Sequence, residues 1–288
     1  MDKKIVYIQS VNEFIERVQE FKKGKTKAWY RGHPEHNYML EPSIYRAPYT
    51  PQSELELMNQ FKSRAIPFLN EVPTHNDYWE WLFLMQHYKV PTRLLDWTES
   101  PLIALAFAVI YREKKGRKGK KQGAHIWCLD PLKLNEDFNS IEHDSVPSIT
   151  ANEHAKEICD KDYAPATGTL ATPVAVYGPQ NNPRIVGQKG VFTIFPGKSK
   201  FSYDAKVTSE LGLKIIIKDE KTVEKIANEL YDLGISESMI YPELDSVSSE
   251  IKREYEKKVK KVVVKKAAVK KVAKKKATKK KATKKKTK

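Results

Sequence analysis

The sequence predicts an α+β (mixed α/β) fold with one main domain, in which buried helices pack on a small, mostly antiparallel sheet, followed by a disordered basic tail. Helical patterns dominate the first 110 residues, and strand-like patterns dominate after residue 124. Two of the helical segments are apolar on nearly every face, which indicates that the fold buries them. The last 32 residues contain 18 lysines and no acidic residue, a composition that cannot form a core.

Composition supports one main domain over residues 1–250 and a lysine-rich tail over residues 251–288. The chain has 288 residues, of which 40% are hydrophobic, and its five tryptophans suit a sizeable core. The net charge of +16 comes from the tail, because the chain without its last 32 residues has 34 basic and 36 acidic residues. The two cysteines lack CxxC spacing and the N-terminus lacks an apolar signal segment, so we expect a cytoplasmic protein without a transmembrane segment.

Capping patterns predict the first helices. Ser10 and Glu13 form a capping box ahead of apolar residues at helical spacing, which predicts a helix over residues 10–22. A second capping box, SELE, predicts a helix over residues 53–70, which Pro67 ends or kinks.

Two apolar helices are expected to flank a polar connector, HYKVPTRLLDWTES at residues 87–100. Asn76 caps the expected first helix, which is rich in Trp, Phe and Leu. Thr98, with Pro101 in the first turn, opens the expected second helix, PLIALAFAVIYR. A connector that merely turned the chain would need residues such as Gly, Asn and Ser. Its arginine, aspartate, histidine and tryptophan therefore indicate a structural clamp or the edge of a site.

Short apolar segments predict the strands of the sheet. They are KAWYRG, which enters a turn at Gly32, and, later in the chain, AHIWCLD, PVAVYG, RIVGQKGVFTIF and LKIIIK. Gly190 lies at the centre of RIVGQKGVFTIF and indicates a hairpin or a bulge there. Three further helices are expected: a short one at ANEHAKEICD, one at EKTVEKIANELYDLG that ends at Gly234, and one in YPELDSVSSEIKREYEKK.

Four sequence blocks resemble the FRG domain family and occur in that family's order. They are WYRGH at residues 29–33, LEPSIYR at 40–46, QHYKVPTRLLDWTESPLIALAFA at 86–108 and RIVGQKGVFTIF at 184–195. Tyr30, Arg31 and Gly32 represent the aromatic-Arg-Gly motif of the family, and Lys89-Val90 replaces a common Gly-Leu. The resemblance implies a fold and a site region. It also implies a prokaryotic or phage-linked setting, sometimes one of phage defence or toxin action.

A more distant similarity to arginine-type ADP-ribosyltransferases implies an alternative, NAD-dependent function. In that comparison Arg31 resembles the NAD-anchoring arginine, and Thr193 stands for the Ser or Thr of a later strand. The glutamate that completes the site in that family has no match here, because Glu237 and Glu243 lie outside a Glu-x-Glu or Gln-x-Glu pattern. Whether the chain is an enzyme stays open, and a non-catalytic protein-interaction module is a second alternative.

The candidate site residues each have a structural alternative. Arg31 ends a strand before a glycine, and its guanidinium can bind a phosphate bidentately or pair with an acid of the fold. Arg93 and Asp96 are near enough in sequence to pair: either the pair clamps the connector between buried helices, or Asp96 orients Arg93 toward a ligand. Gln86 and His87 lie at the polar end of an apolar helix, where His87 either caps carbonyl groups or acts as a general base.

These residues are expected to surround a phosphate-bearing ligand. Arg184 and Gln188, the polar members of a strand-like block, are expected to contact this ligand or to lie at a sheet edge. The expected ligand-binding residues are Arg31, Gln86, Arg93, Arg184 and Gln188, and the candidates for catalysis are His87, Asp96 and Thr193. The sequence contains no Walker loop, GxGxxG, GxSxG or HExxH motif. Its histidines also lack ligand spacing, so no metal site is expected, and no cofactor is expected outside the NAD alternative.

The tail resembles the lysine-rich tails of histone-H1-like proteins. Its lysines repel one another, so we expect the unbound tail to be disordered or partly helical. DNA or RNA is the expected partner, because neutralised phosphates release counterions whatever the base sequence, and the protein would then be nucleoid-associated. A basic amphipathic helix on an anionic membrane and a purely solubilising tail are the alternatives. The lysines expected to contact nucleic acid include Lys265, Lys266, Lys274, Lys275, Lys276, Lys284, Lys285 and Lys286.

Overall fold

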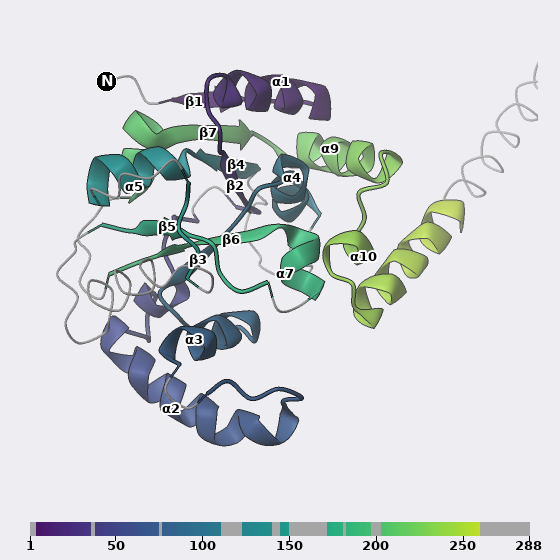
Figure 1. The fold of residues 1–288 in the computed structure, drawn as a ribbon. Coiled ribbons are helices and arrows are strands. Elements are labelled where there is room, and N and C mark those ends of the chain that lie inside the picture. The colour runs from purple at the N-terminus through teal and green to yellow at the C-terminus, as the bar shows by residue number, and fades with distance from the viewer. Residues whose placement is uncertain are drawn as a thin grey trace, which may run out of the picture. The chain divides into compact units, whose positions relative to one another are not determined.

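The computed structural model of the chain describes residues 4–35, 38–74, 77–110, 123–139, 145–149, 172–180, 183–196 and 203–259. The chain divides into two compact units, Met1–Ile235 and Ser236–Lys288. The first unit contains the sheet whose strands are labelled in Figure 1.

The described residues form one seven-stranded mixed sheet with the order β1-β7-β4-β2-β3-β6-β5. Its strands are β1 (Ile5–Tyr7), β2 (Trp29–His33), β3 (Leu94–Thr98), β4 (Ala124–Leu129), β5 (Val174–Val176), β6 (Gly190–Ile194) and β7 (Gly212–Ile217). β1 and β7 pair in parallel, and every other neighbouring pair is antiparallel. The predicted α+β class with a mostly antiparallel sheet is therefore confirmed.

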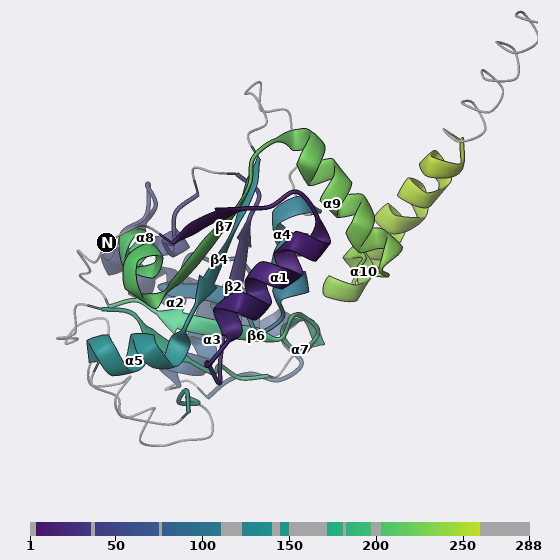
Figure 2. The ribbon, with the colours of Figure 1, turned by 90° about the horizontal axis from the view of Figure 1, so that it is seen from above.

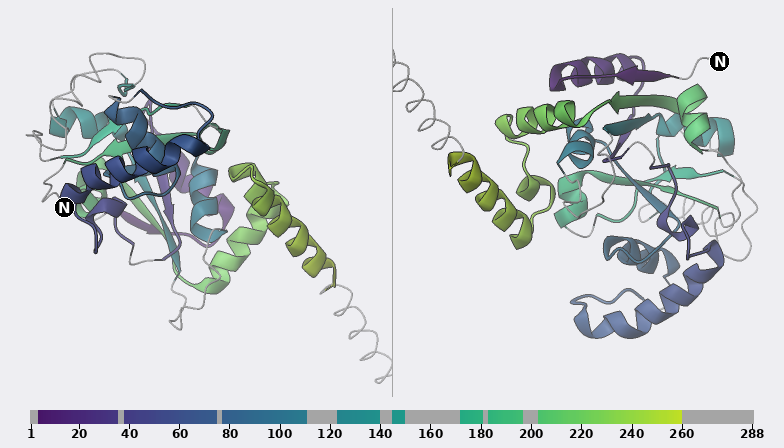
Figure 3. Two further views of the ribbon diagram at one scale, coloured as in Figure 1. Left: turned by 90° about the horizontal axis from the view of Figure 1, so that it is seen from below. Right: turned by 180° about the vertical axis from the view of Figure 1, so that it is seen from behind.

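Helices cover both faces of the sheet. They are α1 (Val11–Lys22), α2 (Glu54–Ala65), α3 (Tyr78–His87), α4 (Pro101–Val109), α5 (Pro131–Asn139), α7 (Pro183–Gln188), α8 (Tyr203–Lys206) and α9 (Glu220–Asp232). Figure 2 shows α1, α4 and α9 on one side of strands β7, β4 and β2, with α5 and α8 on the other. α2 and α3 pack over β5 and β6, where a buried aromatic and aliphatic cluster joins them (Figure 3).

The sheet consists of two halves that meet at a narrow junction. β1, β7, β4 and β2 form one half, in which β2 and β4 pair along five residues. β3, β6 and β5 form the other half, in which β3 and β6 also pair along five residues. The two halves are linked through the single pair Tyr30↔Thr98 between β2 and β3. Polar groups that follow Tyr30 on β2 therefore lie where the two halves of the sheet part.

Gly32 lets helix α4 lie directly on strand β2. A Cβ atom at this position would be 1.9 Å from the carbonyl oxygen of Ala104 and 2.8 Å from the backbone nitrogen of Ala108. The prediction of a turn at Gly32 is wrong, because β2 continues to His33 and the glycine serves this close approach instead.

The polar connector of residues 87–100 contains a strand, which the sequence analysis did not predict. Strand β3 supplies four buried residues and one exposed residue, Asp96. Thr98, the predicted helix cap, ends this strand and accepts a hydrogen bond from the backbone N–H of Ser100 at 3.0 Å. Ser100 is the residue that precedes helix α4. A five-residue strand between two helices gives too short a pattern to separate from a loop.

The block RIVGQKGVFTIF is half helix and half strand, so the prediction of a strand-like block with a hairpin or bulge at Gly190 is wrong. Pro183 occupies the first position of helix α7, where its fixed φ suits a helix. Lys189 has a φ of 47° and ends the helix, and β6 begins at Gly190. Arg184 and Gln188 therefore lie on a helix and not on a strand.

Several caps and helix ends follow the predictions, and two differ. Ser10 caps α1 by accepting the backbone N–H of Glu13 at 3.2 Å, and Gly234 ends α9 with a φ of 82°. α2 passes into a 3₁₀ turn, Ile66–Phe68, at the position of Pro67. Helix α3 is capped by Asp77, whose side chain accepts a hydrogen bond from the Glu80 N–H at 3.0 Å. The Ser53 hydroxyl does not cap α2, because it forms hydrogen bonds with the backbone of Thr50 in the preceding turn. Asn76 and the predicted helix at ANEHAKEICD lie outside the described residues.

The second unit contains helix α10 (Glu237–Ile240) and a helix over residues 244–259, which confirms the helix predicted in YPELDSVSSEIKREYEKK. The tail lysines named above lie outside the described residues. Across the part of the chain that the structure describes, no helix is long and apolar enough to cross a membrane.

Replacement of Gly32 by alanine is expected to destabilise the protein by about 3 kcal/mol, because the new methyl group overlaps the backbone of α4. Gly190→Ala is the matched control, since its nearest neighbour is the side-chain Cγ2 of Ile185 at 3.3 Å, and its effect is expected to stay within about 1 kcal/mol. Urea unfolding of both variants measures the difference. Equal stabilities would contradict the close packing of α4 on β2.

Candidate functional site

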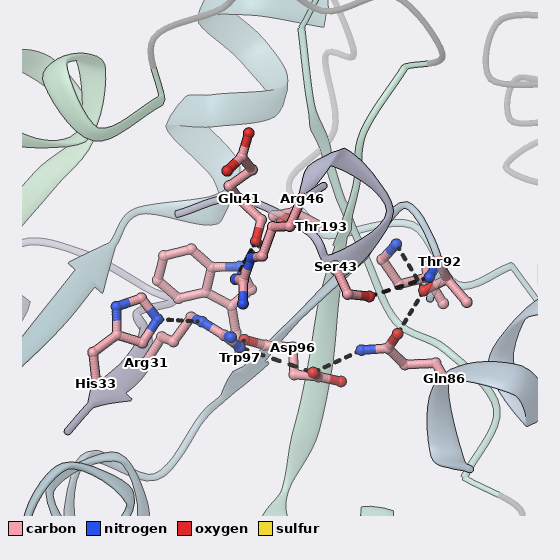
Figure 4. Close-up of polar contacts among 11 residues, drawn as sticks. Arg31, His33, Glu41, Ser43, Arg46, Gln86, Thr92, Asp96, Trp97 and Thr193 are labelled. Atoms are coloured by element: carbon pink, nitrogen blue, oxygen red, sulfur yellow. Dashed lines mark hydrogen bonds and ion pairs between the residues drawn. The ribbon is translucent and has the colours of Figure 1, made fainter. Parts of the chain in front are cut away.

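Arg31 spans the gap between the two halves of the sheet. Its Nη1 donates a hydrogen bond to the backbone carbonyl of Asp96 at 2.5 Å and lies 3.9 Å from the Asp96 carboxylate. Its Nε donates to Nε2 of His33 at 2.9 Å. The Arg31 side chain is 21% exposed, so the charge stays partly in contact with solvent. Figure 4 shows this guanidinium between His33 on one side and Asp96 on the other.

His33 is held in its neutral form. Burial and the neighbouring positive charge of Arg31 lower the pKa of His33 well below the usual value. Because Nε2 accepts the hydrogen bond from Arg31, the ring proton lies on Nδ1. Nδ1 is 3.2 Å from the Tyr38 carbonyl and 3.1 Å from Nε2 of His125, and both of these atoms can accept that proton. A chain of polar contacts thus runs from His125 through His33 to Arg31.

Asp96, Gln86 and Thr92 extend this network toward helix α3. The amide nitrogen of Gln86 donates to the Asp96 carboxylate at 2.7 Å, and the Thr92 hydroxyl donates to the Gln86 carbonyl oxygen at 2.5 Å. The Thr92 backbone N–H in turn donates to the Ser43 hydroxyl at 3.3 Å. Asp96 is 54% exposed, so its carboxylate faces solvent at the end of a chain of oriented groups (Figure 4).

Arg46 supplies a second positive charge near the same point. Its Nη2 donates to the Glu41 backbone carbonyl at 2.5 Å. Its charge contributes, with that of Arg31, to the lowered pKa of His33, so both guanidinium groups act on one imidazole. Figure 4 shows Arg46 projecting toward Arg31 from the segment that carries Glu41 and Ser43. Arg46 is not among the residues predicted for the site from the sequence, although it closes the LEPSIYR block.

Arg93 forms a buried ion pair with Glu54 of helix α2, and the predicted pairing with Asp96 is replaced by this contact. Arg93 Nε donates to Glu54 Oε2 at 2.6 Å, and the Arg93 backbone N–H donates to Glu54 Oε1 at 2.7 Å. The side chains are 1% and 0% exposed. Tyr78 also donates to Glu54, at 2.8 Å, and burial raises the pKa of this phenol well above its usual value, so it remains a donor.

The Arg93–Glu54 contact is a clamp between α2, α3 and the start of β3. Removing one partner of a buried pair leaves the other charge without compensation, which typically costs about 3–5 kcal/mol. Glu54 belongs to the SELE sequence, whose acids the capping pattern places on an exposed first turn. Its burial follows from the packing of α2 against the connector, which no local pattern reveals.

The remaining candidate residues are spread around the sheet. His87 is the last residue of helix α3 and is half-buried. Its ring packs edge-on against the ring of Tyr88, with 4.8 Å between the ring centroids. Thr193 is fully buried on β6, where its hydroxyl accepts a hydrogen bond from the Trp97 indole at 3.1 Å. Arg184 and Gln188 lie on α7, and the backbone carbonyl of Gln188 accepts a hydrogen bond from Thr98 at 2.7 Å.

The structure thus brings Arg31, Gln86 and Asp96 into one hydrogen-bonded network, with Arg46 close by. The two guanidinium groups can bind an anion. The solvent-facing carboxylate, held by the Gln86 amide, can accept hydrogen bonds from hydroxyl or amino groups of the same ligand. Within the described ranges, no group of three or more His, Cys, Asp or Glu side chains is arranged to hold a metal ion.

The neutral state of His33 makes stability depend on pH. Below about pH 6.5 His33 of the unfolded chain binds a proton, and His33 of the folded chain does not, because its pKa is lowered. The free energy of unfolding therefore decreases as the pH falls below this value. His33→Gln is expected to make the fall in unfolding free energy between pH 6.5 and 5 shallower by up to about 1.4 kcal/mol per pH unit. Urea unfolding across this range measures the slope, with His87→Gln as the control that leaves His33 in place. A slope unchanged by His33→Gln would contradict a neutral His33.

Comparison with known proteins gives one family match. No curated protein and no solved structure matched the chain. The family model of the FRG domain matches residues 26–117. This segment runs from just before β2 to just beyond α4 and contains Arg31, Arg46, Gln86 and Asp96 together with the Arg93–Glu54 clamp. Residues 26–117 of the chain are therefore an FRG domain.

Proposed function

We propose that the FRG domain binds a phosphate-bearing ligand between Arg31 and Arg46, in a protein held on nucleic acid by its lysine-rich tail. The observation that carries the proposal is the approach of two guanidinium groups to one neutral imidazole, where the halves of the sheet part. Clustered positive charges repel one another, so a fold that keeps them together gains stability when an anion binds.

Arg31 and Arg46 each donate a hydrogen bond to a backbone carbonyl group. The Asp96 carboxylate is 3.9 Å from Arg31, close to the limit for an ion pair, and it is more than half exposed. Arg46 donates to a backbone carbonyl, which carries no net charge. Each guanidinium has five N–H donors arranged in a planar fork that matches phosphate oxygens. A phosphate is therefore the ligand group that this site fits best.

Gln86 and Asp96 are proposed to orient the rest of the ligand. Asp96 is held by Gln86, which is held by Thr92, and the carboxylate faces solvent at the end of that chain. A carboxylate in this position accepts hydrogen bonds from hydroxyl or amino groups, as on a sugar or a base. Arg93 leaves the proposed ligand set, because its side chain is buried against Glu54. His87, Arg184 and Gln188 are assigned to the edge of the region and not to the phosphate contact.

The proposal does not extend to ADP-ribosyl transfer. Thr193 is the residue that supplies the second element of that site in the resemblance, and its hydroxyl is buried and already accepts a hydrogen bond from Trp97. The DNA or RNA assignment of the tail rests on composition. Eighteen lysines without an acidic residue favour polyphosphate partners through counterion release. A nucleoid-associated protein of this kind fits the phage-defence setting that the family resemblance implies.

Inorganic pyrophosphate is the probe for the ligand site. Arg31→Ala and Arg46→Ala are each expected to weaken its binding by about 10- to 100-fold, the range for loss of a charge-assisted hydrogen bond. Calorimetric titration of the full-length variants measures the change, since the contribution of the tail is the same in each. Arg17→Ala is the matched control, because Arg17 is exposed and pairs with Glu20. Undiminished binding in both site variants, at unchanged thermal stability, would refute the site.

Deletion of residues 257–288 tests the tail. Affinity for a labelled duplex at 50 mM salt is expected to fall by at least about 100-fold, and the salt dependence of binding is expected to flatten. A chain of the same length in which the tail lysines are replaced by glutamine separates charge from length. If low-salt affinity survives the deletion, the tail is not the nucleic-acid anchor. The pyrophosphate result is independent of this outcome.

A further inference from the structure

The helix over residues 244–259 carries an exposed apolar stripe. Its members are Leu244 (87% exposed), Val247 (41%), Ile251 (61%), Tyr255 (69%) and Val259 (44%). They are spaced by three or four residues, so they share one face of the helix about 120° wide. A soluble helix normally buries such a face, and a contiguous exposed apolar patch marks an interaction site.

The neighbouring helix in the same unit binds a different face. Ser238 of α10 donates to the Glu250 carboxylate at 2.5 Å, and this hydrogen bond lowers the pKa of Glu250. Glu250 lies about 100° around the helix from Ile251. The hydrogen bond from α10 is therefore made outside the apolar stripe, and the stripe residues remain exposed.

We infer that the stripe binds the same stripe of a second copy of this chain, with the two helices antiparallel. The stripe is nearly symmetric about Ile251, with Val247 four residues before it and Tyr255 four residues after it. In an antiparallel pair centred on Ile251, each Val247 therefore meets a Tyr255 of the other copy. A two-fold interface requires this kind of self-complementary surface.

Charge selects the antiparallel orientation. The helix is acidic near its start, at Asp245, and basic near its end, at Lys257 and Lys258. Antiparallel pairing places Lys257 and Lys258 of one copy at the opposite end of the pair from those of the other copy. Parallel pairing would instead bring together two tails with 18 lysines each. The antiparallel pair separates the starts of the tails by about 20 Å, which exceeds the Debye length of about 8 Å at physiological salt.

An anionic membrane is a poorer partner for this stripe. Helices that lie on such membranes carry a basic polar face. The polar positions here include four acids, at Asp245, Glu250, Glu254 and Glu256, which balance the four basic residues Lys252, Arg253, Lys257 and Lys258.

The antiparallel dimer carries two lysine-rich tails, which leave it in opposite directions. Two tails would hold one nucleic acid more tightly than one tail does, because the second contact becomes intramolecular.

Disulfide trapping tests the inference on the full-length chain with Cys159 replaced by serine; the remaining Cys128 is buried. Ile251→Cys is expected to give a covalent dimer on mild oxidation, because the two copies of residue 251 meet at the centre. Leu244→Cys is expected to stay uncrosslinked, since its two copies lie about 21 Å apart. A mixture of Leu244→Cys and Lys258→Cys chains is expected to crosslink. Efficient crosslinking of Leu244→Cys alone would overturn the antiparallel arrangement.

Sedimentation equilibrium without cysteine variants gives the second readout. The chain is expected to dimerise with rising concentration, and Ile251→Asp is expected to be monomeric at every concentration tested. Ser249→Asp is the matched control, because Ser249 lies on the opposite side of the helix from Ile251, and it is expected to dimerise normally. Circular dichroism shows whether each variant keeps its helix. A monomeric parent chain, or one that binds vesicles of anionic phospholipid through the stripe, would overturn the inference.

Discussion

The buried ion pair between Arg93 and Glu54 is the contact on which the arrangement of this domain depends. It joins helix α2 to the residue just before strand β3, and Tyr78 of helix α3 donates a further hydrogen bond to Glu54. A charge without water must be matched by an opposite charge and by donors in fixed positions. The pair therefore determines where the connector enters the sheet and, with it, the positions of Thr92 and Asp96.

The proposed ligand site is built outward from this fixed connector. Thr92 lies beside the clamp and orients Gln86, and Gln86 orients Asp96. From the other half of the sheet, Arg31 reaches the backbone carbonyl of Asp96. Because the two halves share one residue pair, this side-chain contact also bridges them. The buried Arg93–Glu54 pair thus serves the fold, and the more exposed Arg31 and Asp96 belong to the proposed site.

Close packing of helix α4 explains why the motif around Arg31 includes a glycine. The backbone of α4 lies so near strand β2 that position 32 has no room for a Cβ atom. Adjacent residues of a strand point to opposite faces. With Gly32 on the α4 face, Arg31 points to the face that carries His33 and Trp127. A residue chosen for packing therefore also aims the arginine.

Local patterns in the sequence determined the α+β class, the caps of α1 and α9, and the identity of the motif blocks, because these depend on residues close together in the chain. They also placed Arg31, Gln86 and Asp96 among the candidates. Only the tertiary structure decided that Arg93 pairs with Glu54, that Arg46 and His33 join the site, and that half of the RIVGQKGVFTIF block is helical. Contacts between residues distant in sequence decide burial and charge pairing, and neither periodicity nor composition records which distant residue a side chain will meet.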